Sequence, residues 1–487
     1  MDDGKEWGWQ AKYFDNFGDS QWNQLDESVK NAIDKHPQLA KYYICIPLDR
    51  PDARIDKQKS AKQKWDERVI KWTQWANDKD MNVEFVYWGS SELLKCLMLP
   101  QNTGKQRFWF ESVGFDKGWF EQRLELAIKT AGPRYTPEIH VDLPIAKSFE
   151  NFGRTIELFK TAKIFLKDLR SKISSFEHSI RKIDENILND PLKNFNENLQ
   201  ITEKLFEEIA YQPIGELLFG QIVSQIDSCL KSNTVIEEIL HKCDQEQRKN
   251  NPKKDYSYSK TSCGDALNNL RALRYELQKI ESSLKDLDAC ASSSLLILQG
   301  SAGTGKTHLL CDVAKHRINQ NQPTILLMGH QFTTSESPWN QARLHLDLPP
   351  MTLEEFVGAL ESSAQASDCR VLILIDAINE GSGREFWPVH LASFLTAIKR
   401  SPWIGVVISI RSSYINIIPK EILDDGYLLT HNGFEDTEYD AVKTFFTHYG
   451  IELPSSPLLT QEFQNPLFLK TLCSGLKESG ERRLPRG

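Results

Sequence analysis

The feature that most constrains the fold is an apolar run that leads into a glycine-rich segment. Residues 295–307 read Leu-Leu-Ile-Leu-Gln-Gly-Ser-Ala-Gly-Thr-Gly-Lys-Thr. The first four residues predict a buried strand, and His308-Leu-Leu predicts the entry of a helix. Glycines between a strand and a helix allow backbone angles that turn several N–H groups toward one anion. The pattern therefore predicts a phosphate-binding loop.

The residues of this loop have distinct expected tasks. We expect Lys306 to reach the β- and γ-phosphates of ATP and the Thr307 hydroxyl to join the shell of Mg²⁺. The positive end of the following helix adds to the attraction for phosphate. The residues expected to bind the nucleotide here are Gly300, Ser301, Ala302, Gly303, Thr304, Gly305, Lys306, Thr307 and His308.

A second motif supports the same reading. Residues 371–380 read Val-Leu-Ile-Leu-Ile-Asp-Ala-Ile-Asn-Glu, an apolar run that ends in a carboxylate. A buried strand of this kind places Asp376 at the carboxyl edge of a parallel sheet, where it can bind nucleotide-bound Mg²⁺. Glu380 follows four residues later and is expected to orient or deprotonate the attacking water. A further strand, at 324–328, indicates the ATPase division that inserts a strand between these motifs and uses a glutamate base.

A third apolar run, at 404–410, ends in Arg411. An arginine at the tip of a neighbouring strand can reach a γ-phosphate and so distinguish ATP from ADP. The alternative is that Arg411 only forms an ion pair at the protein surface.

The first 145 residues predict a small α/β domain. Strands are expected near 6–14, 42–48 and 83–88, with helices over 21–35 and 58–77, and this alternation favours a sheet with helices on its faces. Strand period two places Glu6, Gln10 and Lys12 on one face. The alternative is that they are ordinary exposed strand residues.

Residues 132–145 are rich in turn formers, with Gly132-Pro-Arg-Tyr-Thr-Pro at their start, and predict a linker. Residues 146–290 predict a helical region. Apolar residues step by three and four over 166–187 and again over 270–287, which indicates an antiparallel helical pair or bundle. The basic segment 248–260 has no period and predicts a flexible connector.

Composition limits the function classes. The 487 residues suggest about three domains, and the net charge of -8 supplies no overall basic field for nucleic acid or lipid. Nine scattered cysteines without a CxxC spacing argue for a reducing cytosol, and against a disulfide framework or a zinc site. No apolar run reaches the ~20 residues of a membrane span, and the N-terminus lacks a signal-peptide core. We expect an α/β multidomain protein of the cytoplasm without membrane contact.

The nucleotide motifs resemble those of the STAND class of signalling ATPases. Residues 376–380 are similar to the NACHT form of the acidic motif, and Arg411 matches the sensor arginine. Residues 433–436 resemble the start of the small helical subdomain, and Asn465-Pro-Leu-Phe-Leu resembles the segment whose proline, here Pro466, packs on adenine. The resemblance implies an ATPase core over 291–430 and part of a helical subdomain over 431–487.

Residues 10–12, Gln-Ala-Lys, resemble the Mrr-like branch of the PD-(D/E)xK nucleases, in which the lysine assists the attacking water. The resemblance implies Gln10 and Lys12 as half of a site for duplex DNA. The other half is a metal-binding acid on a preceding strand, and Asp2 and Asp3 lie too close to Gln10 to supply it. We therefore expect the domain over 1–145 to be incomplete. Glu6, which shares the face of Gln10 and Lys12, is the candidate substitute for the missing acid.

The order of nuclease-like domain, helical linker and ATPase resembles prokaryotic antiviral STAND proteins of the AVAST group. The resemblance implies self-association on ATP binding and activation of the nuclease. It also implies a viral protein ligand, recognised by a carboxyl-terminal sensor that no segment of this sequence matches. The alternatives are a regulatory scaffold with an inactive nuclease fold and a DNA-processing motor, although no paired DNA-tracking motifs follow Asp376.

Overall fold

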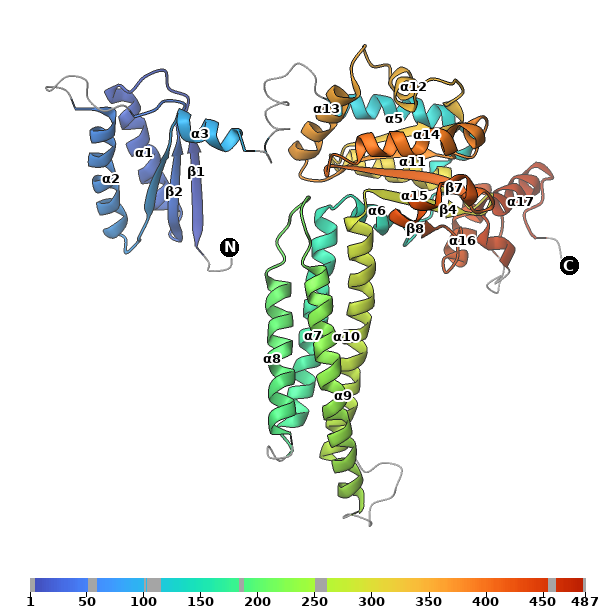
Figure 1. Ribbon diagram of the computed structural model, residues 1–487, viewed down its shortest axis with the longest axis horizontal. Helices are drawn as coiled ribbons and strands as arrows, with labels where there is room; N and C mark the ends of the chain where they lie inside the picture. Colours follow the sequence, from blue (N-terminus) through green and yellow to red (C-terminus); the bar gives the residue numbers. More distant parts are fainter. Residues whose placement is uncertain are drawn as a thin grey trace. The chain divides into compact units, whose positions relative to one another are not determined.

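The computed structural model describes residues 5–50, 59–99, 102, 115–183, 188–249, 261–453 and 461–484. Asp2, Asp3 and most of the basic segment 248–260 lie outside the described residues. The chain divides into two compact units, Met1–Phe110 and Glu111–Gly487, which are described separately (Figure 1).

The first unit contains the predicted sheet, which has three parallel strands in the order β1-β2-β3. Its elements are β1 (Glu6–Ala11), α1 (Asp19–Lys35), β2 (Leu39–Cys45), α2 (Ala61–Asn77), β3 (Glu84–Trp88) and α3 (Ser90–Leu97). Helix α1 buries a stripe of residues spaced by three and four, namely Trp22, Leu25, Val29 and Ile33. These side chains share one core with Tyr42 and Ile44 of β2 and with Trp72 of α2. Both helices therefore cover the same face of the sheet, whereas the alternation favoured helices on its faces.

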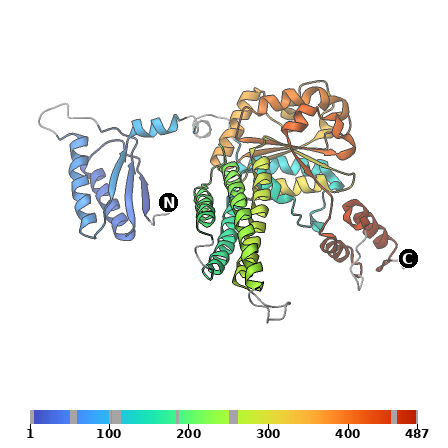
Figure 2. The ribbon, with the colours of Figure 1, turned by 60° about the horizontal axis from the view of Figure 1, so that its bottom comes forward.

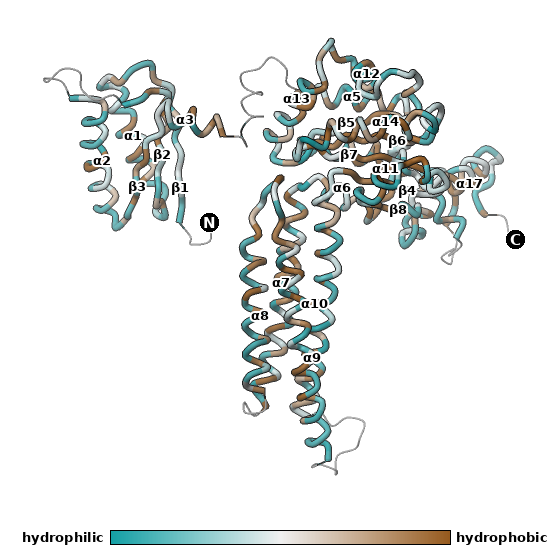
Figure 3. Tube along the Cα trace, viewed as in Figure 1, coloured by the Kyte–Doolittle hydropathy of each residue, from teal (hydrophilic) through white to brown (hydrophobic). Residues whose placement is uncertain are grey.

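The larger sheet belongs to the second unit and has the order β5-β6-β7-β4-β8, with every neighbouring pair parallel. Its strands are β4 (Leu295–Gly300), β5 (Thr324–Met328), β6 (Val371–Asp376), β7 (Ile404–Arg411) and β8 (Tyr427–Thr430). The first four occur at the expected apolar runs, and their residues are nearly all buried. Figure 3 shows these hydrophobic strands at the centre of the unit. Because all strands run in one direction, the loops after β4, β6 and β7 lie at one edge.

Helices connect and cover these strands. They are α11 (Lys306–Asn319), α12 (Pro338–His345), α13 (Leu353–Ala366), α14 (Gly383–Ile398) and α15 (Lys420–Asp425), with short 3-10 turns η5 (Gly329–Gln331) and η6 (Ser412–Ile417).

The boundary between the units differs from the expected one at residue 145. Helix α5 (Lys117–Ala131) packs in the core of the larger sheet, where Phe120, Leu124 and Ala127 join residues of β4 and β5. It continues through η2 (Gly132–Arg134) and η3 (Pro137–Ile139) to α6 (Ala146–Phe152). An amphipathic period shows that a helix covers an apolar surface, but it does not show which sheet supplies that surface.

The helical region forms a four-helix bundle with its own core (Figure 1). Its helices are α7 (Ile156–Ile180), α8 (Asn189–Glu207), α9 (Phe219–Lys249) and α10 (Ser262–Ser292). Two buried arginines fasten it to the sheet. Arg154 Nε and Arg370 Nη1 each donate to the carbonyl oxygen of Ala291 at 2.8 Å, which satisfies the carboxyl end of α10.

One cysteine pair contradicts the expectation of free thiols. Cys243 near the end of α9 and Cys263 in the first turn of α10 form a disulfide, with their Cα atoms 6.0 Å apart. The two lie 20 residues apart in sequence, and only the antiparallel packing of α9 and α10 brings them together. The spacing of these two cysteines in the sequence therefore does not predict the disulfide.

The carboxyl-terminal part forms a small helical subdomain of α16 (Glu438–Tyr449), η7 (Gln461–Gln464) and α17 (Pro466–Glu478) (Figure 2). Its core includes Phe445, Phe446 and Leu469, together with Ile139 and Val141 from the segment after α5. Among the described residues, no helix has both the length and the apolar character that a bilayer span requires.

The placement of α5 can be tested by mutation. Phe120 is 3% exposed, and Phe120→Ala should destabilise the unit that carries the phosphate-binding loop by about 3–5 kcal/mol, because it leaves a cavity in that core. The exposed Leu126 of the same helix is the control, and Leu126→Ala should change stability by less than about 0.5 kcal/mol. Hydrogen exchange of peptides from β4 and β5 measures the effect. Unchanged protection of these strands in the Phe120 variant would place α5 elsewhere.

Candidate functional site

The glycine-rich loop joins β4 to α11 at the carboxyl edge of the larger sheet. Gly303 and Gly305 have φ values of 80° and 91°, in the left-handed region that favours glycine. At Gly300, a Cβ atom would lie 2.5 Å from the carbonyl oxygen of His431. The glycines are therefore required by backbone conformation and by close packing.

Lys306 is held at the mouth of this loop. Its Nζ donates to the carbonyl oxygens of Gly300 at 2.7 Å and Ser301 at 2.9 Å. Burial lowers the pKa of Lys306 to about 8, with the Asp376 carboxylate opposing the shift. The ammonium is therefore held mainly by carbonyl oxygens at this position, and an anion in the loop would bind it more strongly.

Asp376 is fully buried between two hydroxyl donors. Thr307 Oγ1 donates to its Oδ2 at 2.7 Å, and Ser409 Oγ of β7 donates to its Oδ1 at 2.6 Å. Burial raises the pKa of the Asp376 carboxyl, and these two hydrogen bonds oppose the rise. Ser409 was not foreseen, although a polar residue inside the apolar run 404–410 was a signal for it.

The residues fit Mg²⁺ only together with a phosphate ligand. In the parts of the chain that the structure describes, no group of three or more His, Cys, Asp or Glu side chains could hold a metal ion. Thr307 and Asp376 nevertheless bring two hard oxygen ligands together. Mg²⁺ is usually held by one or two such ligands, several waters and substrate phosphate, so this pair is sufficient in that setting.

Glu380 lies in the turn after β6, where two arginines contact its carboxylate. Arg411 Nη2 donates to Oε1 at 3.0 Å, and Arg134 Nη1 donates to Oε2 at 2.9 Å. The backbone N–H of Arg411 also donates to Asn379 Oδ1 at 3.0 Å, which ties β7 to this turn. Arg134 was missed, because its turn-rich segment reads as a linker between domains.

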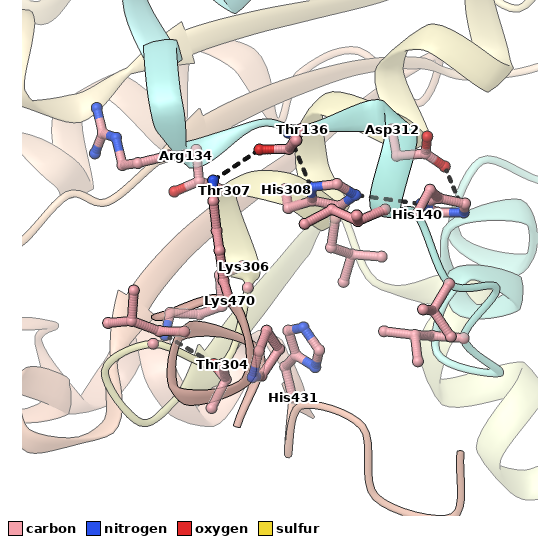
Figure 4. A pocket seen from close by; sticks show the side chains of 18 of the residues that line it. Arg134, Thr136, His140, Thr304, Lys306, Thr307, His308, Asp312, His431 and Lys470 are labelled. Carbon is pink, nitrogen blue, oxygen red and sulfur yellow. Dashed lines mark hydrogen bonds and ion pairs between the residues drawn. The ribbon is translucent and has the colours of Figure 1, made fainter. Parts of the chain in front are cut away.

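A second wall of the site is the segment 132–142, which we call the strap. His308 Nδ1 accepts from the backbone N–H of Thr136 at 3.4 Å, and His308 Nε2 lies 3.3 Å from His140 Nδ1 (Figure 4). His140 Nε2 in turn lies 3.3 Å from Asp312 Oδ2 of α11. Burial lowers the pKa of His308 to about 4, so this histidine is neutral near pH 7 and its Nε2–H donates to His140.

The third wall is α17 of the helical subdomain. The backbone N–H of Leu467 donates to the Gly303 carbonyl at 3.1 Å, and Lys470 Nζ donates to Pro133 O and Thr136 Oγ1, both at 2.8 Å. Pro466 lies beside Gly305. The loop, the strap and α17 line a cavity of about 1010 Å³, which is large enough for a nucleotide.

Within the part of the chain that the structure describes, the candidate nuclease residues of the first unit, unlike the nucleotide-site residues of the second, are not connected to one another by hydrogen bonds. Glu6 Oε2 lies 3.0 Å from His36 Nδ1, and Gln10 Oε1 accepts from Tyr42 OH at 3.2 Å. The rise of a strand separates Glu6 from Gln10 by about 13 Å. Among the described residues, no hydrogen bond or ion pair connects Glu6, Gln10 and Lys12.

Comparisons with known proteins give the chain no family. No protein-family model and no curated protein sequence matches it. Solved structures do match. Cdc6p from Pyrobaculum aerophilum is 13% identical, with a TM-score of 0.26 over 39% of this chain and 57% of that one. PCH-2 of C. elegans is 17% identical, with a TM-score of 0.21 over 34% of this chain and 44% of that one. The chain spans about half the length of these proteins, and likeness at this level carries no functional argument.

Buried His308 predicts how stability depends on pH. An unfolded histidine binds its proton near pH 6.5, whereas the pKa of folded His308 is about 4, so the unfolded state binds more protons between these values. The stability that His308 contributes is present above pH 6.5 and is lost as the pH falls toward 4. Buried His431, with its pKa also lowered to about 4, acts in the same direction.

Thermal unfolding between pH 7 and pH 4.5 measures this loss of stability, which should be smaller in His308→Gln. Equal losses in the two proteins would contradict this account.

Proposed function

We propose that the chain binds ATP with Mg²⁺ in this cavity and hydrolyses it. The observation that carries the proposal is the hydrogen bond between Thr307 and Asp376, which joins two motifs 69 residues apart at one sheet edge. Around it lie a phosphate-binding loop, a lysine and a glutamate, the parts that phosphoryl transfer to water requires. Asp376 is buried at the end of its strand with hydroxyl donors on both oxygens, an arrangement that supports a ligand site rather than a structural loop.

Each residue then has one task. Backbone N–H groups of the loop and the amino end of α11 bind the phosphates, and Lys306 exchanges its carbonyl partners for phosphate oxygens. Bound Mg²⁺ would neutralise charge that develops on the phosphates, with Thr307 and Asp376 as its protein ligands. Glu380 accepts a proton from the attacking water at its carboxylate. Arg411 binds the γ-phosphate.

We further propose a signalling role of the STAND kind, in antiviral defence. The motif 376–380, Arg411 and Pro466 support it by resemblance. The hydrogen bond of Leu467 to Gly303 supports it physically, because it connects α17 directly to the loop in which the phosphates would bind. In this proposal, ATP binding leads to self-association, and a viral protein is the trigger.

The first unit would be the effector, a DNA endonuclease-like domain with Gln10 and Lys12 as its candidate residues. The runner-up is a regulatory scaffold with an inactive nuclease fold. The separation of Glu6 from Gln10 favours that runner-up for the described residues of this unit. A DNA-processing motor is a third candidate that no contact favours.

Two variants test the ATPase proposal. Lys306→Ala should abolish ATP binding, because it removes the full positive charge beside the β- and γ-phosphates. Glu380→Gln should retain binding and slow hydrolysis about 10²–10⁴-fold, because it keeps the size of the side chain and removes the base. Equilibrium binding and single-turnover hydrolysis separate the two effects. Normal turnover by the Glu380 variant would show that another group is the base.

A plasmid assay tests the nuclease proposal. With Mg²⁺, and with or without ATP, we expect this chain to leave duplex DNA uncut. Mg²⁺ needs one or two carboxylates, and the candidate Glu6 lies about 13 Å from Gln10. Supercoiled plasmid incubated with the chain and with Lys12→Ala measures nicking. Metal-dependent cutting that Lys12→Ala removes would overturn this expectation and establish an active nuclease.

A further inference from the structure

We propose that Arg134 of the strap is a second ATP-sensing arginine, which holds Glu380 until a γ-phosphate draws its guanidinium away. The inference rests on the proposed ATPase function and adds a residue from outside the motifs of that function. Before ATP binds, Arg134 and Arg411 together form what we call the arginine clamp on Glu380.

The clamp occupies both oxygens of the carboxylate. Arg134 bonds to Oε2 and Arg411 to Oε1, at 2.9 and 3.0 Å. With both oxygens engaged by guanidinium donors, the carboxylate has fewer lone pairs left to accept a hydrogen bond from an attacking water. The residue expected to act as the base is therefore engaged in this state.

The backbone on both sides of Arg134 is anchored, while its side chain is partly open to solvent. Lys470 bonds to Pro133 O and Thr136 Oγ1, and the Thr136 N–H bonds to His308 at the start of α11. The Arg134 side chain itself is 36% exposed. The strap thus presents a guanidinium at a fixed point of the cavity, where it has room to change partners.

Arg134 also acts on the phosphate end of the site. It lines the same cavity as Lys306 and Thr307. Asp376 and Glu380 line this cavity as well, and the Arg134 guanidinium already contacts Glu380 Oε2 at 2.9 Å. Arg134 is therefore within reach of the space between the two carboxylates, where Mg²⁺ and the γ-phosphate would lie.

A γ-phosphate is a stronger partner for the clamp than Glu380 is. It carries more negative charge than one carboxylate and offers three oxygens to the planar fork of an arginine. The ion pairs of the clamp are partly open to solvent, which weakens them, so the exchange of partners is reversible. ADP has no γ-phosphate and leaves the clamp closed, whereas ATP opens it and frees Glu380 beside the attacking water.

A double-mutant cycle tests the clamp through the affinities for ADP and for a non-hydrolysable ATP analogue with Mg²⁺. The four proteins are the wild type, Arg134→Ala, Glu380→Gln and the double variant. In each background, Arg134→Ala should leave ADP affinity within about twofold and weaken binding of the ATP analogue. In the Glu380→Gln background, binding of the ATP analogue breaks no ion pair to Arg134. There, Arg134→Ala should reduce the affinity for the analogue about tenfold or more. With Glu380 present, the loss should be smaller by about two- to fivefold, the strength of one exposed ion pair.

The cycle separates this role from simple support of the fold. Equal weakening of ADP and the ATP analogue by Arg134→Ala would make the arginine structural and overturn the inference. An effect of the same size with Glu380 intact and in the Glu380→Gln background would also overturn it, because no clamp would then exist. Arg134→Lys keeps the positive charge but loses the planar, forked guanidinium. It should therefore recover part of the difference between the affinities for the ATP analogue and for ADP. Lys129→Ala, which removes a charge from the exposed end of α5, is the matched control and should behave as the wild type.

The experiment also distinguishes failure of the inference from failure of the proposed function. If the wild type binds neither nucleotide, or binds both as Lys306→Ala does, the ATPase proposal and the clamp both fail. If the wild type binds nucleotide through Lys306 and Arg134→Ala changes nothing, only the clamp fails.

Discussion

The hydrogen bond from Thr307 to the buried Asp376 is the interaction on which the rest of the site depends. It connects the start of α11 with the end of β6 across the intervening β7, and β7 contributes Ser409 to the other carboxylate oxygen. The desolvated carboxylate is thus paired on both sides. Because parallel strands end at one edge, the loop, Glu380 and Arg411 converge there without further constraint.

Segments that look unrelated in sequence complete the cavity. The strap lies more than 150 residues before the loop, yet it supplies Arg134, Thr136 and His140. Helix α17 contributes Leu467 and Lys470 from the carboxyl-terminal side. The strap bonds to α17 through Lys470, to α11 through His308 and to Glu380 through Arg134. A ligand that moves any one of these partners changes the contacts of the others, as a nucleotide-dependent switch requires.

The sequence predicts the features of this protein that depend on residues close together in the chain. Four-residue apolar runs mark buried strands, and Gly303 and Gly305 stand where the backbone needs positive φ. The contact of Thr307 with Asp376 was predictable because each belongs to a motif, but contacts between distant segments that carry no motif were not. Helix α5 could have covered either sheet, the Cys243–Cys263 pair depends on how two long helices pack, and Arg134 lies in a segment that reads as a linker. Of these unpredicted residues, only Ser409 could have been recognised from the sequence, because it is a polar residue within an apolar run.

The most direct test of the account is a pair of experimental structures, one with Mg²⁺–ADP and one with Mg²⁺–ADP and beryllium fluoride, a mimic of the γ-phosphate. We expect both to have the nucleotide in the loop between Lys306 and the strap, with Thr307 and Asp376 beside the metal. With ADP alone, Arg134 and Arg411 should remain on Glu380, and with beryllium fluoride both guanidiniums should lie on the fluoride and Glu380 on a water. Intact ion pairs to Glu380 in both structures, or a nucleotide outside this cavity, would contradict the account.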